Sequence, residues 1–218
     1  MNLRSYINND VTPLLPVQKV KEAHEMFANL TQTHIPVVDN NYLMGSISED
    51  DIQGYDANKK IEDYTYALDT FFVRTDTSWL DVLQAFATHN TDMMPVLNQY
   101  REYVGYYNLI DVVSLFEETP FFKEPGGILI IEKGNREYSF SQISQIVESN
   151  NGILLGAFIS EIRENTTQIT LKIGNVGLNA IIQTFRRYNY EIVSGNEDDA
   201  YLEDLKDRSN YFKKFLNI

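Results

Sequence analysis

The apolar positions in the first half of the chain form a pattern that occurs twice. The segment HIPVVD at residues 34–39 recurs as MMPVLN at residues 93–98, and GSISEDDI at 45–52 recurs as GYYNLIDV at 105–112. The two offsets differ by one residue, and the extra residue falls in a polar stretch where a hairpin turn tolerates insertion. The pattern therefore indicates an internal duplication.

A helical pattern precedes each copy. Val20, Ala23 and Phe27 follow the i, i+3, i+7 spacing of an amphipathic helix, and apolar residues recur 59 positions later. Each unit is predicted as a short strand, a helix, a strand, a hairpin, a strand and a final helix that begins near Glu49 or Leu109. Units of this size bury little surface alone, so we expect the two to pack against each other.

The two units resemble a tandem pair of cystathionine-β-synthase (CBS) domains. The matching features are the apolar-Pro-Val segment, the hairpin, and Gly-x-x-[Ser/Thr]-x-x-Asp opening a helix. The resemblance covers residues 1–122, with repeats at about 5–58 and 66–118. It implies an α+β fold in which two βαββα repeats pack sheet to sheet.

In that family the helix-opening motif binds adenine nucleotides, with the Asp on the ribose hydroxyls and the Ser/Thr facing the phosphates. The resemblance assigns these roles to Ser48 and Asp51 in the first repeat and to Asn108 and Asp111 in the second. The family's adenine slot corresponds here to Val11, Thr12, Ile35 and Pro36, and to Phe72, Val73, Met94 and Pro95.

A structural interpretation of the same motifs stands beside this one. A polar residue followed three positions later by a carboxylate is also a helix cap, worth about 1 kcal/mol. Both interpretations remain open from the sequence: nucleotide binding at one or both motifs, or helix caps without a ligand.

The second half of the chain has a different pattern. Residues 126–196 are predicted as βαββαβ, an order that implies an antiparallel sheet with both helices on one face. This order is similar to the ACT domain, a small-molecule-sensing module that often pairs across a dimer. The turn at residues 132–137 lacks the Pro-Gly pair of amino-acid-binding members, which favours a packing or dimerisation role.

A C-terminal helical tail is predicted for residues 197–218. It either docks on its own domain or is exchanged across a homodimer.

Charge and composition narrow the partners. The chain has 31 acidic and 18 basic residues, a net charge of −13, and most of the excess lies in residues 1–125. Such a field disfavours nucleic acid, anionic lipid and a triphosphate. No cysteine and no apolar run long enough for a bilayer occur, so we expect a cytoplasmic protein.

No catalytic motif stands out. His24, His34 and His89 have no metal-ligand spacing, and structural or surface roles are expected for each. We therefore expect no enzyme, no metal and no required cofactor.

The leading hypothesis is a regulatory sensor. Its CBS pair binds an adenosine-containing nucleotide such as AMP, ADP or ATP, and its ACT-like domain dimerises or relays the signal. The alternative is a ligand-free dimeric scaffold. The domain order also resembles bacterial acetoin-utilisation accessory proteins.

Overall fold

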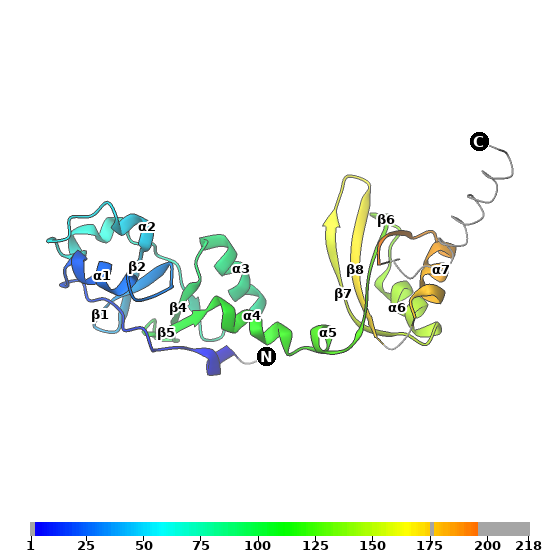
Figure 1. The fold of residues 1–218 in the computed structure, drawn as a ribbon, viewed down its shortest axis with the longest axis horizontal. Helices are drawn as coiled ribbons and strands as arrows, with labels where there is room; N and C mark the ends of the chain where they lie inside the picture. The colour runs from blue at the N-terminus through cyan, green and yellow to red at the C-terminus, as the bar shows by residue number, and fades with distance from the viewer. Residues whose placement is uncertain (1–2, 175–176, 196–218) are drawn as a thin grey trace. The chain divides into compact units, whose positions relative to one another are not determined.

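The computed structural model describes residues 3–174 and 177–195 (Figure 1). The chain divides into two compact units, residues 1–116 and 117–218. The predicted helical tail at 197–218 lies outside the described residues. Each unit has its own apolar core and is described by itself.

The first repeat follows the predicted order with two differences. Its elements are η1 (Leu3–Tyr6), α1 (Val20–Phe27), β1 (His34–Asp39), β2 (Tyr42–Ser48), α2 (Glu49–Ile52) and η2 (Ile61–Ala67). The β1–β2 turn places Asn40 and Asn41 at φ of 47° and 69°, as a two-residue hairpin loop requires.

The first strand of this repeat, which the family's adenine slot places at Val11 and Thr12, does not form there. The only strand-like pairing of this segment is a single parallel bridge between Leu14 and Val37. Pro13 and Pro16 flank Leu14, and proline cannot donate a backbone hydrogen bond to a ladder. The strand is therefore reduced to one bridge, two residues beyond the predicted range.

The helix predicted near Glu49 is a single turn. Its equivalent in the second repeat, α4 (Leu109–Glu117), has nine residues, whereas α2 has four. Gly54 stands where α4 has Ser114, and glycine destabilises a helix by roughly 1 kcal/mol relative to alanine. The glycine explains why the first of the two helices ends early.

The second repeat contains β3 (Val73–Arg74), α3 (Trp79–His89), β4 (Met93–Leu97), β5 (Tyr103–Asn108) and α4. β3 pairs in parallel with β4, and β4 pairs antiparallel with β5. The three strands form one sheet, and Val82 and Phe86 of α3 pack into its core with Val96 and Tyr107.

The two repeats exchange backbone contacts reciprocally. Ser46 of β2 forms a bridge with Asp69 in the leading segment of the second repeat, and Tyr106 of β5 forms a similar bridge with Asn8 in the leading segment of the first. Ser46 and Tyr106 occupy matching positions of the duplication. The first unit is therefore a paired arrangement with approximate twofold character.

The second unit contains α5 (Pro120–Lys123), β6 (Gly126–Gly134), α6 (Phe140–Ser149), β7 (Ile153–Ile162), β8 (Thr166–Gly174), α7 (Asn179–Arg187) and β9 (Glu191–Ser194). The strands form one antiparallel sheet in the order β7-β8-β6-β9.

Helices α6 and α7 cover one face of this sheet (Figure 1). Leu129 and Leu171 from the sheet pack with Ile143 of α6 and with Ile182 and Phe185 of α7, and all five are almost fully buried. The alternation along β6 and β8 puts these strand residues on the helix side. This packing fixes the sheet's inner face.

Candidate functional site

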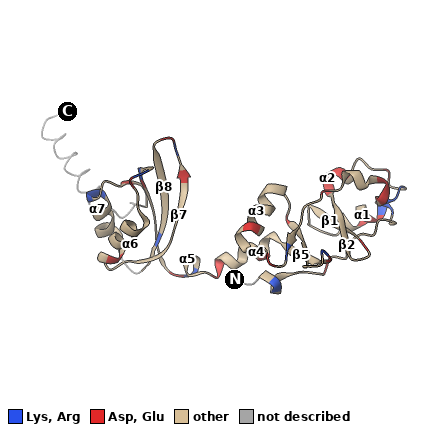
Figure 2. Cartoon of the chain, turned by 180° about the vertical axis from the view of Figure 1, so that it is seen from behind, with Lys and Arg blue, Asp and Glu red and all other residues tan. Residues whose placement is uncertain are grey.

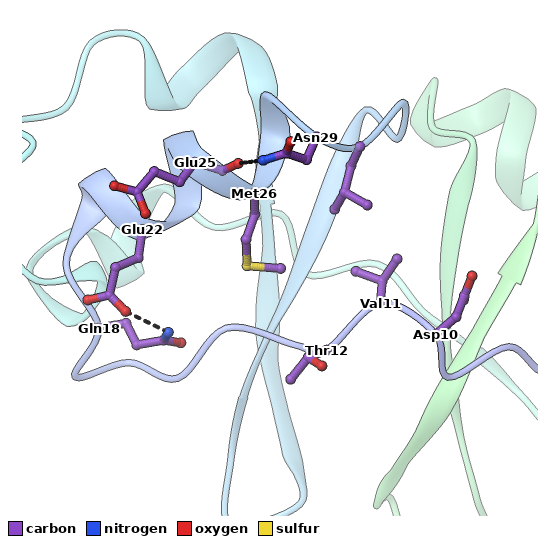
Figure 3. A pocket seen from close by; sticks show the side chains of 9 residues that line it. Asp10, Val11, Thr12, Gln18, Glu22, Glu25, Met26 and Asn29 are labelled. Carbon is purple, nitrogen blue, oxygen red and sulfur yellow. Dashed lines mark hydrogen bonds between the residues drawn. The ribbon is translucent and has the colours of Figure 1, made fainter.

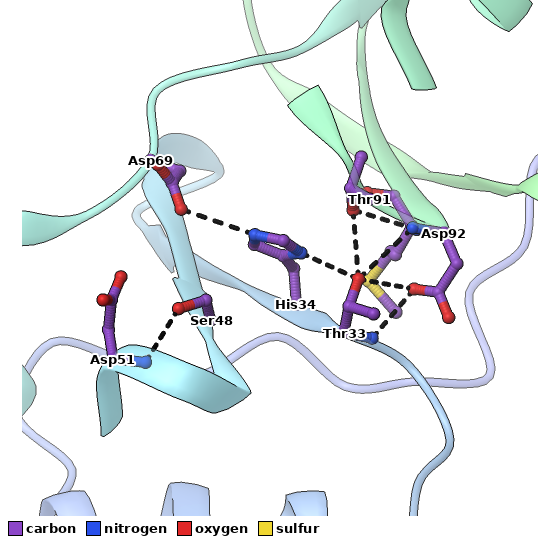
Figure 4. Close-up of polar contacts among 8 residues, drawn as sticks. Thr33, His34, Ser48, Asp51, Asp69, Thr91 and Asp92 are labelled. Carbon is purple, nitrogen blue, oxygen red and sulfur yellow. Dashed lines mark hydrogen bonds and ion pairs between the residues drawn. The ribbon is translucent and has the colours of Figure 1, made fainter. Parts of the chain in front are cut away.

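Ser48 and Asp51 lie at the wall of a cavity of about 270 Å³ in the first unit. Ser48 is the N-cap of α2, and its Oγ accepts a hydrogen bond from the Asp51 N–H at 3.0 Å (Figure 4). The capping interaction expected for Ser48 is therefore present, and the carboxylate of Asp51 is left at the exposed rim. The lining residues are Thr33, His34, Ser48, Glu49, Asp50, Asp51, Asp69, His89 and Asn90.

His34 occupies the centre of this site. Its Nε2 lies 3.4 Å from Asp69 Oδ2, and its Nδ1 lies 2.8 Å from Thr33 Oγ1 (Figure 4). Burial lowers the pKa of His34 below its usual value of 6.5, and the nearby charges of Asp69, Asp92 and Asp51 oppose that shift. Burial is the largest cause, so the imidazole is neutral near pH 7.

A hydrogen-bonded pair next to His34 links the two repeats. The Thr33 N–H and hydroxyl donate to Asp92 Oδ1 at 2.8 and 2.9 Å (Figure 4). Thr33 and Asp92 occupy equivalent positions of the duplication, 59 residues apart. The Thr33 hydroxyl contacts both the His34 ring and Asp92, so it connects His34 to the second repeat.

An aromatic ring lies between the two histidines of the cavity. Phe71 meets the His34 ring edge-on at 5.2 Å between centroids and stacks on His89 at 4.8 Å. Structural or surface roles are expected for both histidines from the sequence, and both line this cavity. The Ser48 and Asp51 motif pointed to this cavity in the sequence, whereas no local spacing relates His34 to His89.

The equivalent motif in the second repeat is engaged by the chain itself. Asp111 Oδ2 accepts a hydrogen bond from Asn8 Nδ2 at 2.7 Å, and Asn108 Oδ1 accepts one from the Ile110 N–H at 2.9 Å. The hydroxyl of Tyr106 donates to Asp10 Oδ1, and the Tyr106 side chain is 1% exposed. The N-terminal segment therefore occupies the partners that a ligand would need here.

The residues expected to form the adenine slot do not gather around one cavity. Val11 and Thr12 line a separate cavity of about 530 Å³, together with Glu22 and Glu25 (Figure 3). Phe72 is 46% exposed. The other expected slot residues are buried in strands: Ile35, Pro36, Val73, Met94 and Pro95. Their places follow from the strand register, which turns Ile35 and Met94 into the repeat cores.

Negative charge gathers at α2 (Figure 2). Three of the four residues of α2 are acidic: Glu49, Asp50 and Asp51. Asp69 lines the same cavity. In the described ranges, no group of three or more His, Asp or Glu side chains has the arrangement of a metal site. No helix in those ranges is long and apolar enough to cross a membrane.

Comparison with known proteins identifies the class. The model of the CBS domain family matches residues 3–58 and 63–118, about half of the chain. The chain belongs to the CBS domain family, and the tandem pair predicted from the duplication is confirmed.

Individual relatives are distant. An uncharacterized protein of Methanocaldococcus jannaschii is 26% identical over 121 residues, which cover 55% of this chain and 46% of that protein. The chain thus matches about half the length of this relative.

Among solved structures, a CBS domain pair/ACT domain protein from Thermotoga maritima is similar at 18% identity, covering 54% of this chain and 98% of its own, with a TM-score of 0.49. CBSX2 in complex with AMP is similar at 19% identity, covering 51% and 93%, with a TM-score of 0.43.

Proposed function

We propose that the first unit is a regulatory module that binds one adenosine-containing ligand per chain. The ligand binds in the cavity beside Ser48 and Asp51 of the first repeat (the first-repeat cavity). The observation that carries this proposal is the asymmetry between the two motifs. Asp51 faces a cavity beside His34, whereas Asp111 already accepts a hydrogen bond from Asn8.

The chemistry of the cavity suits a nucleoside. The Asp51 carboxylate can accept hydrogen bonds from two ribose hydroxyls, and the imidazoles of His34 and His89 can stack on or hydrogen-bond a purine. At about 270 Å³ the cavity is just below the range of roughly 300–1,000 Å³ typical of small-molecule sites. That size favours a nucleoside over a dinucleotide.

Regulation requires that the ligand prefer one arrangement of the two repeats. The Thr33–Asp92 hydrogen bonds join the repeats beside His34. A ligand that moves His34 or Asp69 would act on this junction, and would act on the Ser46–Asp69 backbone bridge as well. The role proposed for the pair is sensing without catalysis.

For the second unit we propose an ACT-type dimerisation role. The order β6-α6-β7-β8-α7-β9 and the sheet order β7-β8-β6-β9 support this assignment. β7 is an edge strand with exposed Ile153, Phe158 and Ile162, which are 51%, 50% and 70% exposed. Apolar side chains on an unpaired edge favour association of two copies.

Isothermal titration of the full chain with adenosine, AMP, ADP, ATP and NAD tests the sensing role. We expect binding by at least one of them at one ligand per chain. Asp51→Asn should abolish it, because the amide keeps one acceptor oxygen where the two ribose hydroxyls need two. Asp111→Asn is the matched control and should leave binding unchanged. Two ligands per chain, or loss of binding in the control alone, would contradict the assignment.

Light scattering tests the dimer. Ile162→Asp should shift the protein to monomers, whereas Ile110→Asp in the first unit, at a similarly exposed position, should not. A dimer that binds none of the ligands would favour the alternative, a ligand-free scaffold.

A further inference from the structure

We infer that the ligand of the first-repeat cavity is an adenosine derivative without phosphate, either uncharged or positively charged on its 5′ side. This inference rests on the proposed function and names the ligand class of the same site. Three observations at the cavity support it: the charge of its walls, the use of its backbone amides, and a buried hydroxyl.

The walls of the first-repeat cavity carry negative charge. Glu49, Asp50, Asp51 and Asp69 line the cavity, and Lys and Arg do not occur among the described residues that line it. His34 supplies no compensating charge near pH 7, since burial lowers its pKa. A phosphate group would enter a confined space beside four carboxylates, where charge repulsion is only partly screened by salt.

Two of the backbone donors that could hold a phosphate are already used. The Glu49 N–H donates to the Thr33 carbonyl at 3.0 Å, and the Asp51 N–H donates to Ser48 Oγ at 3.0 Å. α2 has only four residues, so its aligned peptide dipoles add little positive potential at its start. The start of α2 therefore lacks the features that make longer helices bind anions.

A neutral polar group lies next to the site. Ser46 is 1% exposed, and within the described part of the chain its Oγ has no hydrogen-bond partner. Side chains two apart on a strand share a face, so Ser46 lies on the face of β2 that carries the cavity-lining Ser48.

The second repeat has a tyrosine at the matching position. Tyr106 fills the equivalent space with its ring and donates its hydroxyl to Asp10. Asp10 and Asp69 are themselves equivalent, 59 residues apart. In the first repeat the smaller Ser46 leaves its hydroxyl without a partner among the described residues, and a hydroxyl is suited to an uncharged partner.

A charge series tests the inference. The probes are 5′-amino-5′-deoxyadenosine, adenosine, AMP and ATP, titrated into the full chain at low and at physiological salt. We expect the affinity to fall in that order, with AMP at least about tenfold weaker than adenosine at low salt and a smaller gap at high salt. AMP or ATP binding more tightly than adenosine would overturn the inference while leaving the proposed function intact. If no probe binds, the proposed function fails and the inference fails with it.

A variant that removes charge from the cavity tests whether its carboxylates cause the preference for ligands without phosphate. Glu49→Gln/Asp50→Asn should raise the ratio of AMP affinity to adenosine affinity by several-fold. Glu25→Gln/Asp76→Asn removes the same charge from the same unit outside this cavity, and should leave the ratio unchanged. Equal ratios in both double variants would mean that local charge does not select the ligand.

Discussion

Gly45→Ala is expected to destabilise the first unit strongly, because Gly45 lies where the second repeat's leading segment crosses β2. Its φ is +154°, and an added Cβ would lie 2.7 Å from Leu68 Cβ and 2.9 Å from the Asp69 carbonyl oxygen. Neither atom is the flexible end of a side chain, so the backbone would have to move. The strained backbone costs about 1–3 kcal/mol and the overpacking about 1–3 kcal/mol more.

These costs sum to about 2–6 kcal/mol of unfolding free energy. For a unit of this size, a loss of 1 kcal/mol lowers the melting temperature by roughly 4 °C, so Gly45→Ala should lower it by about 8–24 °C. Thermal unfolding followed by circular dichroism measures the shift. Gly105→Ala should behave alike, since Gly105 has φ of +130° and its added Cβ would come within 3.0 Å of the Asn8 carbonyl oxygen.

Gly54→Ala is the control for this prediction. An added Cβ there meets only the Asp51 carbonyl oxygen, at an ordinary 3.6 Å. This variant should unfold at or slightly above the wild-type temperature. If Gly45→Ala melted as Gly54→Ala does, the crossing of the two segments as described here would be refuted.

Three further predictions concern single side chains. Because burial lowers the pKa of His34, the first unit should lose stability as the pH falls below about 6.5 and through the lower folded-state pKa. Urea unfolding from pH 7.5 to 5.5 should show the free energy of unfolding falling with pH, and His34→Gln should reduce that dependence. Ser48→Ala should cost about 1 kcal/mol of unfolding free energy and Ser48→Thr less, and equal losses would argue against the cap. Phe185→Ala should cost the second unit about 3–5 kcal/mol in calorimetry, and a matching shift of the first unit's transition would contradict separate cores.

Local spacing predicted much of the first unit. The hairpin turn at Asn40 and Asn41, the face of α1 that buries Val20 and Phe27, and the Ser48 cap all depend on residues within a few positions of one another. Interactions of that range appear directly in the periodicity of a sequence.

Longer-range effects were missed or misplaced. The first strand is reduced to a bridge at Leu14, two residues past its predicted range, because Pro13 and Pro16 limit pairing around Leu14. The contacts of His34 and His89 were not visible, because their shared neighbour Phe71 lies 37 and 18 residues away in the chain. The expected adenine slot was divided between a second cavity and the cores, since strand register decides which side chains turn inward.

The amino-acid sequence alone determined that this protein is a duplicated pair with matched motifs, because duplication and helix spacing are properties of the order of residues. The replacement of Ser48 by Asn108 favoured the first motif already in the sequence, but only the tertiary structure decided which motif lies open beside a cavity. Asn8 donates a hydrogen bond to Asp111, 103 residues away in the chain, whereas Asp51 lies beside a cavity. That difference arises where chain crossing brings distant segments together, and no local pattern records which segment will fill which space.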